Sequence, residues 1–127
     1  MKTLHTISAV AEIGFGVLLL CFPSAAATLL IGTPLLDTPA ALTLMRLGAS
    51  GLIALGTACW LARDDSRSPA TTGLVAAMLF YNFAAVVVLA YTGLGLHLRG
   101  PGLWPAVILH TVMACWCVAG LRRRPGA

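Results

Sequence analysis

Four long runs of apolar residues, separated by short polar segments, dominate the chain. They cover approximately residues 4–22, 39–62, 69–92 and 103–121. A bilayer core about 30 Å thick needs roughly 20 helical residues to cross it, so runs of this length are typical of transmembrane helices. We therefore predict an all-α protein with one integral membrane domain spanning residues 1–127. Its expected architecture is a four-transmembrane-helix bundle in up-down-up-down order.

The first apolar run has the least sharply defined end, because Pro23 interrupts it and apolar residues continue through 25–31. Lys2, the apolar run and Ser24–Ala27 together resemble a secretory signal peptide. Two features favour a retained helix instead. Glu12 falls inside the apolar region, and Leu18 stands in a segment, LLLC, where a lipoprotein signal has a small residue. We expect this first helix to remain part of the protein.

Composition and charge agree with a membrane location. Hydrophobic residues make up 59% of the chain and charged residues only 9%, which excludes an ordinary soluble domain. Six of the eight Lys and Arg residues lie at the termini or in the 63–68 loop, which share one side of a four-span protein. The positive-inside rule then predicts that both termini are cytoplasmic. The basic C-terminal residues could contact anionic lipids, but a nucleic-acid interface needs a larger basic face.

The four cysteines do not indicate a disulfide framework or a metal site. Cys21 is expected near the opposite membrane face from Cys59, Cys115 and Cys117. Cys115 and Cys117 are two residues apart and so point to different faces of a helix. We interpret all four as small apolar helix residues.

Each predicted helix carries one strongly polar residue well inside its span: Glu12, Arg46, Asn82 and His110. The helical rise of about 1.5 Å per residue places all four in a layer roughly one turn thick. Glu12, Arg46 and His110 have small residues four positions away, which is typical of faces where membrane helices pack closely. On the third helix, Tyr81 has the better packing pattern, with Ala77 and Ala85 beside it.

A lone charge near the middle of a bilayer costs about 2.5–3.5 kcal/mol on insertion scales. We therefore predict that Glu12 and Arg46 form a buried ion pair, with Tyr81, Asn82 and His110 completing an intramembrane polar cluster. Two alternatives stay open. The pair could serve only to fix helix register, or Arg46 could extend alone toward the outer interface. Intramembrane ionisable residues otherwise indicate a functional pocket.

Motifs for specific chemistry are absent from the sequence. It contains no GxSxG, HExxH, phosphate-binding loop or dinucleotide motif, and we assign no catalytic residue and no metal ligand. His5, His97 and His110 lie at different predicted depths, which argues against a haem held by two histidines. Glu12 and His110 could form an acid–base couple, although no substrate position supports that reading. The cofactor is unknown.

Four segments carry a resemblance to known proteins: AEIGFGVLLLCFP, LMRLGASGLIALGTACWLARDD, MLFYNFAAVVVLAY and LWPAVILHTVMACW. This arrangement resembles a group of small, uncharacterised four-helix proteins of the bacterial inner membrane, DoxX-like in layout. The resemblance implies the same membrane, and some DoxX-like members are linked to quinone or thiol redox systems. The chain lacks a CxxC pair, in contrast to thiol redox proteins.

These observations favour a non-catalytic ligand-binding protein or an accessory protein of a membrane complex. The ligand would be small and hydrophobic or quinone-like, and the partner another membrane protein or a second copy of the chain. The alternative is a membrane-embedded enzyme, quinone- or lipid-linked, or a proton-coupled carrier of small solutes that uses Glu12 and His110.

Overall fold

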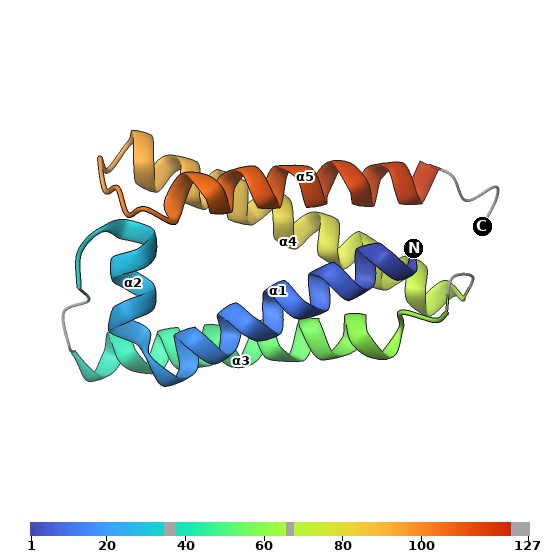
Figure 1. The fold of residues 1–127 in the computed structure, drawn as a ribbon, viewed down its shortest axis with the longest axis horizontal. Helices are drawn as coiled ribbons and strands as arrows, with labels where there is room; N and C mark the ends of the chain where they lie inside the picture. The colour runs from blue at the N-terminus through green and yellow to red at the C-terminus, as the bar shows by residue number, and fades with distance from the viewer. Residues whose placement is uncertain (35–37, 66–67, 123–127) are drawn as a thin grey trace.

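The computed structural model describes residues 1–34, 38–65 and 68–122, and every regular element in these ranges is a helix. The helices are α1 (Lys2–Cys21), α2 (Pro23–Ile31), α3 (Pro39–Leu61), α4 (Pro69–Leu94) and α5 (Leu103–Arg122). Four of them, α1, α3, α4 and α5, are long and apolar enough to cross a membrane. They alternate in direction along the chain, so α1 begins at the end of the molecule where α5 finishes (Figure 1). The predicted all-α architecture is confirmed, with four helices that could span a membrane, and the chain is a small multi-pass membrane protein.

The segment after Pro23 forms a helix of its own, which the sequence did not separate clearly from the first span. Proline lacks a backbone N–H and its ring clashes with the preceding helical turn, so α1 ends at Cys21. The same residue is well suited to the first turn of a new helix, and α2 begins there. With nine residues, α2 is too short to cross a bilayer. It stands across one end of the long helices (Figure 1).

Two of the long helices begin at a hydroxyl residue followed by proline. The side-chain oxygen of Thr38 accepts a hydrogen bond from the backbone N–H of Ala41 at 3.3 Å. In the same way, Ser68 accepts from the backbone N–H of Thr71 at 3.1 Å. Such caps satisfy backbone donors that lack a partner inside the helix. Pro69, where the third apolar run begins, is thus the first residue of α4.

Two glycines allow α1 and α3 to pack closely against each other. A Cβ atom built on Gly16 would lie 2.8 Å from Cγ1 of Ile53, and one built on Gly56 would lie 2.7 Å from Cγ1 of Ile13. Each glycine also lies against the backbone of the other helix, so neither position has room for a side chain. Small residues at such crossings let membrane helices approach closely and gain van der Waals contact.

The four long helices form two pairs, α1 with α3 and α4 with α5 (Figure 1). The pairs meet in a shared apolar cluster near the end where α1 begins. All four helices contribute to this cluster, whose buried members are Leu4, Ala9, Cys59, Val75, Met78, Met113 and Cys117. Cys59 and Cys117 thus serve as small apolar core residues, as predicted, and the four cysteines are free thiols.

At the other end, α2 is tied to the loop between α4 and α5 by backbone hydrogen bonds. The N–H of Gly100 donates to the carbonyl oxygen of Leu30 at 3.1 Å, and that of Gly102 donates to Leu29 at 2.8 Å. These carbonyls belong to the last turn of α2 and have no partner within the helix. The loop therefore caps α2 and holds it against the α4–α5 pair.

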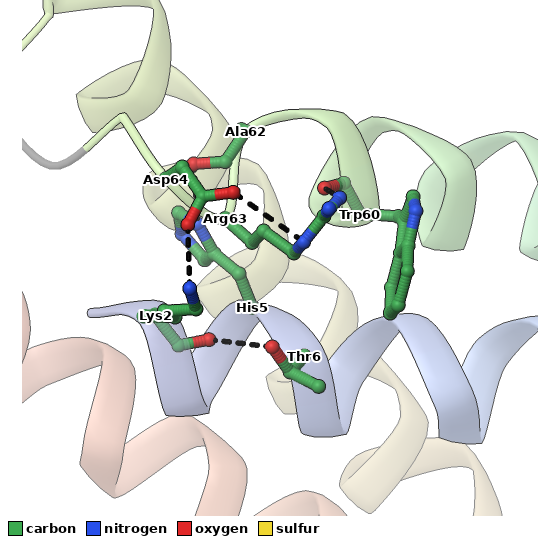
Figure 2. A network of polar contacts seen from close by, with 7 residues as sticks. All are labelled: Lys2, His5, Thr6, Trp60, Ala62, Arg63 and Asp64. Carbon is green, nitrogen blue, oxygen red and sulfur yellow. Dashed lines mark hydrogen bonds and ion pairs between the residues drawn. The ribbon is translucent and has the colours of Figure 1, made fainter.

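A polar network surrounds the beginning of α1 and the end of α3 (Figure 2). The Nδ1–H of His5 donates to the carbonyl oxygen of Ala62 at 3.2 Å, and Lys2 forms an ion pair of 2.8 Å with Asp64. The guanidinium of Arg63 donates to the carbonyl oxygen of Trp60 and lies 4.1 Å from the centre of its ring. These contacts fasten the N-terminal turn to the α3–α4 loop. The side of the membrane on which this end lies stays a prediction.

Replacement of Gly56 by valine should destabilise the protein, because the new side chain would collide with Ile13 and the backbone of Ala9. Overpacking of this kind costs about 1–3 kcal/mol. Thermal unfolding in detergent, followed by circular dichroism, should show a clear drop in Tm. The matched control is Gly51→Val on the same helix, where a Cβ atom meets nothing within 4 Å. Equal losses in both variants would contradict this packing.

The hydrogen bond and charge of Lys2 hold the pKa of the exposed Asp64 carboxyl below its usual range. A lowered folded-state pKa means that this contact stabilises the protein above the ordinary aspartate pKa and is lost as the pH falls through the lowered value. Carboxyl ¹³C NMR should show the Asp64 midpoint rising in Lys2→Gln and at high salt, because salt screens exposed pairs. An unchanged midpoint in Lys2→Gln would show that Lys2 does not act on Asp64.

Candidate ligand-binding cavity

A cavity of about 440 Å³ lies between α1 on one side and α4 and α5 on the other. Its walls are mostly apolar, and Leu30 of α2 contributes to its lining. Met113 belongs both to the cavity wall and to the apolar cluster where the helix pairs meet. The cavity therefore occupies the space between that cluster and α2.

Helical periodicity explains which side chains reach the cavity. On α1, Ser8, Glu12 and Phe15 line it at spacings of four and three residues. Such spacings place residues on one face of a helix. This face adjoins the one that packs against α3, where Ala9, Ile13 and Gly16 lie. On α5 the same rule selects Ala106, Leu109, His110 and Met113, and on α4 it selects Tyr81, Ala85, Val88 and neighbouring residues.

The polar part of the wall consists of Ser8, Glu12, Tyr81, Asn82 and His110. Four of these five residues, Glu12, Tyr81, Asn82 and His110, belong to the polar cluster predicted from the sequence, and all four line the one cavity. Ser8 was noticed only as a small neighbour of Glu12. Its position four residues before Glu12, on the same helical face, could have identified it as a member of the polar cluster.

Asn82 and His110 form a hydrogen-bonded pair with defined polarity. The side-chain amide of Asn82 donates to the backbone carbonyl oxygen of Met78 at 2.7 Å, and that oxygen can only accept. The other atom of the amide, Oδ1, is therefore an acceptor, and it lies 2.8 Å from Nδ1 of His110. His110 must donate from Nδ1 in this contact. Asn82 is 1% exposed, so the arrangement is protected from water.

Glu12 and Tyr81 form the second polar pair, across the cavity from α1 to α4. Glu12 is only 6% exposed, and the hydroxyl of Tyr81 is its side-chain hydrogen-bond partner. The ring of Tyr81 also meets that of His110 edge to face, with centroids 5.6 Å apart. Tyr81 therefore contacts both Glu12 and His110, so the side chains of the polar wall form a continuous series of contacts from α1 through α4 to α5.

The hydroxyl of Ser8 is buried in the cavity wall and has no hydrogen-bond partner among the described residues. An unpartnered buried polar atom costs free energy, on the order of 1–3 kcal/mol. Such atoms in native structures call for a bound water, ion or ligand that completes them. Ser8 therefore marks the cavity as a place where a polar group of another molecule would be stabilised.

The predicted ion pair between Glu12 and Arg46 is wrong. Arg46 lies on an exposed face of α3, and no ion pair joins it to Glu12 in the described part of the chain. The small residues used to place it, Ser50, Ala54 and Ala58, are exposed as well. The packed face of α3 instead carries Ala49, Gly56 and Cys59. Small residues occur all around this helix, so their spacing could not identify the packed side.

The polar wall offers hydrogen-bonding groups more clearly than metal ligands. Within residues 1–34, 38–65 and 68–122, no group of three or more His, Cys, Asp or Glu side chains is placed to hold a metal ion. The cavity combines a long apolar surface with a compact polar patch. This combination suits an amphipathic molecule with a small polar head.

Comparison of the chain with known protein families, with curated proteins and with solved structures finds no match in any of the three. The DoxX-like resemblance is therefore not supported, and no family is assigned. The function has to be argued from the cavity itself.

A double-mutant cycle tests the position of Arg46. Because Arg46 faces away from Glu12, Glu12→Gln and Arg46→Met should change the free energy of unfolding independently, and the double variant should equal their sum within about 0.5 kcal/mol. Reversible unfolding of the three variants and the wild type in one detergent provides the values. A double variant markedly more stable than the sum of the two single effects predicts would show that Glu12 and Arg46 do form an ion pair.

Proposed function

We propose that the protein binds a small amphipathic ligand in the cavity between α1, α4 and α5. The observation that carries this proposal is the unpartnered hydroxyl of Ser8, 1% exposed, in an otherwise largely apolar cavity. The cavity has the volume typical of small-molecule sites, roughly 300–1,000 Å³. Its apolar walls would receive the tail, and the polar wall would receive the head. Quinone-like molecules, and small hydrophobic molecules that carry one polar group, both have such a tail and head.

The cellular setting is part of the same proposal. The concentration of Lys and Arg at the termini and in the 63–68 loop supports cytoplasmic termini. The bacterial inner membrane stays a prediction that rests on the sequence resemblance alone. An accessory role, in which the protein associates with another membrane protein or with a second copy, is compatible with ligand binding. Binding by itself requires no catalytic step, so we favour a non-catalytic protein.

One observation favours a second candidate function. Glu12 and His110 line the same cavity, and each belongs to a residue type that handles protons. A membrane-embedded enzyme or a proton-coupled carrier could use the two groups on a substrate held between them. The two functions share the cavity and differ in whether the bound molecule is changed or moved.

Ligand binding can be tested with a cavity-filling variant. Ala85 lines the cavity, so Ala85→Phe should occupy part of its volume and weaken binding at least about tenfold. The probes are decylubiquinone and 4-nonylphenol, titrated into the protein in detergent by isothermal calorimetry. Ala77→Phe, at an exposed position of the same helix, is the matched control for adding a phenyl ring outside the cavity.

We expect saturable binding of at least one probe to the wild type and to Ala77→Phe, with clear loss in Ala85→Phe. The proposal fails if neither probe binds saturably. It also fails if Ala85→Phe binds as tightly as Ala77→Phe.

A further inference from the structure

Some polar groups of the cavity wall form hydrogen bonds with one another, and others have donors or acceptors that remain available to a ligand. The amide of Asn82 donates to Met78 and accepts from His110. The hydroxyl of Tyr81 is paired with Glu12. The groups left to face a ligand are the hydroxyl of Ser8, the second ring nitrogen of His110 and the carboxyl oxygen of Glu12 that does not pair with Tyr81.

The second nitrogen of His110, Nε2, is an acceptor in the neutral ring. A neutral imidazole carries one proton, and the contact with Asn82 places that proton on Nδ1. No hydrogen bond joins Nε2 to any residue in the described ranges, and His110 lines the cavity. The neutral form is the one that suits this position, because a charge deep in the membrane costs several kcal/mol.

A ligand that fits must therefore bring a donor. A carbonyl or ether oxygen can accept from Ser8 but leaves Nε2 of His110 without a partner. A hydroxyl can donate to Nε2 and still accept from a neighbour. A site built for one partner rejects an analogue without it, since a polar group of the site is then left unsatisfied.

We propose that the cavity selects amphipathic ligands whose head carries a hydroxyl, such as phenols and fatty alcohols, through a hydrogen bond donated to Nε2 of His110. This inference rests on the proposed binding function and adds the chemical class of the ligand. Asn82 acts as a positioning residue, because its acceptor oxygen keeps the proton of His110 on Nδ1 and leaves Nε2 open.

Two probes of nearly equal shape test the preference for a hydroxyl group separately from the ability of the cavity to bind a ligand. 4-Nonylphenol carries the hydroxyl donor, and 4-nonylanisole replaces its hydrogen with a methyl group. We expect wild-type protein to bind the phenol about tenfold more tightly than the anisole, as measured by calorimetry in one detergent. Each affinity is corrected with Ala85→Phe for partition into micelles.

In His110→Phe the phenol should bind only as tightly as the anisole, because the acceptor is gone while an aromatic ring remains at this position. The affinity for the anisole should stay near its wild-type value, which shows that the cavity is intact. A control at the exposed position Thr111, Thr111→Val on the same helix, should leave the preference for the phenol unchanged. A preference that survives in His110→Phe would overturn the assignment of His110.

The tautomer of His110 can be read without any ligand or variant. Side-chain ¹⁵N NMR of the wild type should show His110 protonated on Nδ1 and unprotonated on Nε2. A ring protonated on Nε2 would overturn the inference. Equal binding of phenol and anisole would also overturn it while leaving the proposed binding function in place, whereas failure of these probes and of decylubiquinone to bind would refute the binding function itself.

Discussion

The close contact between α1 and α3 is the constraint on which the rest of the structure depends. Gly16 and Gly56 each lie against the opposite helix with no room for a Cβ atom, so the rotation of α1 about its axis is fixed. With that face used, the adjoining face of α1, which carries Ser8, Glu12 and Phe15, lines the space facing α4 and α5. This packing therefore decides which residues of α1 line the cavity.

The same constraint explains how Glu12 is accommodated without a cation. Arg46 stands on the exposed side of α3, so Glu12 relies on the hydroxyl of Tyr81 and on its place in the cavity wall. Tyr81 in turn contacts His110, whose orientation depends on Asn82. Polar groups from α1, α4 and α5 thus support one another across the cavity, and Ser8 is left with its capacity unused.

The sequence was sufficient to predict the spans and most of the polar cluster. Apolar length identified the four long helices, and the helical rise per residue placed Asn82 and His110 at the level of Glu12. It failed for Arg46, because the small residues around α3 leave its packed face undetermined and only the fit against Ile13 and Ala9 selects it. The cavity itself could not be predicted, since an empty volume depends on how two helix pairs diverge and not on any residue pattern.

Methyl NMR of the four methionines, observed while 4-nonylphenol is added, tests the central claim most directly. Met113 lines the cavity, whereas Met1 and Met45 lie outside its lining. If the cavity is the binding site, the Met113 methyl signal should shift saturably and those of Met1 and Met45 should stay in place. Absence of a Met113 shift would contradict a binding site at this position. Equal shifts of all the methyl signals that continue to grow without saturation would contradict it as well.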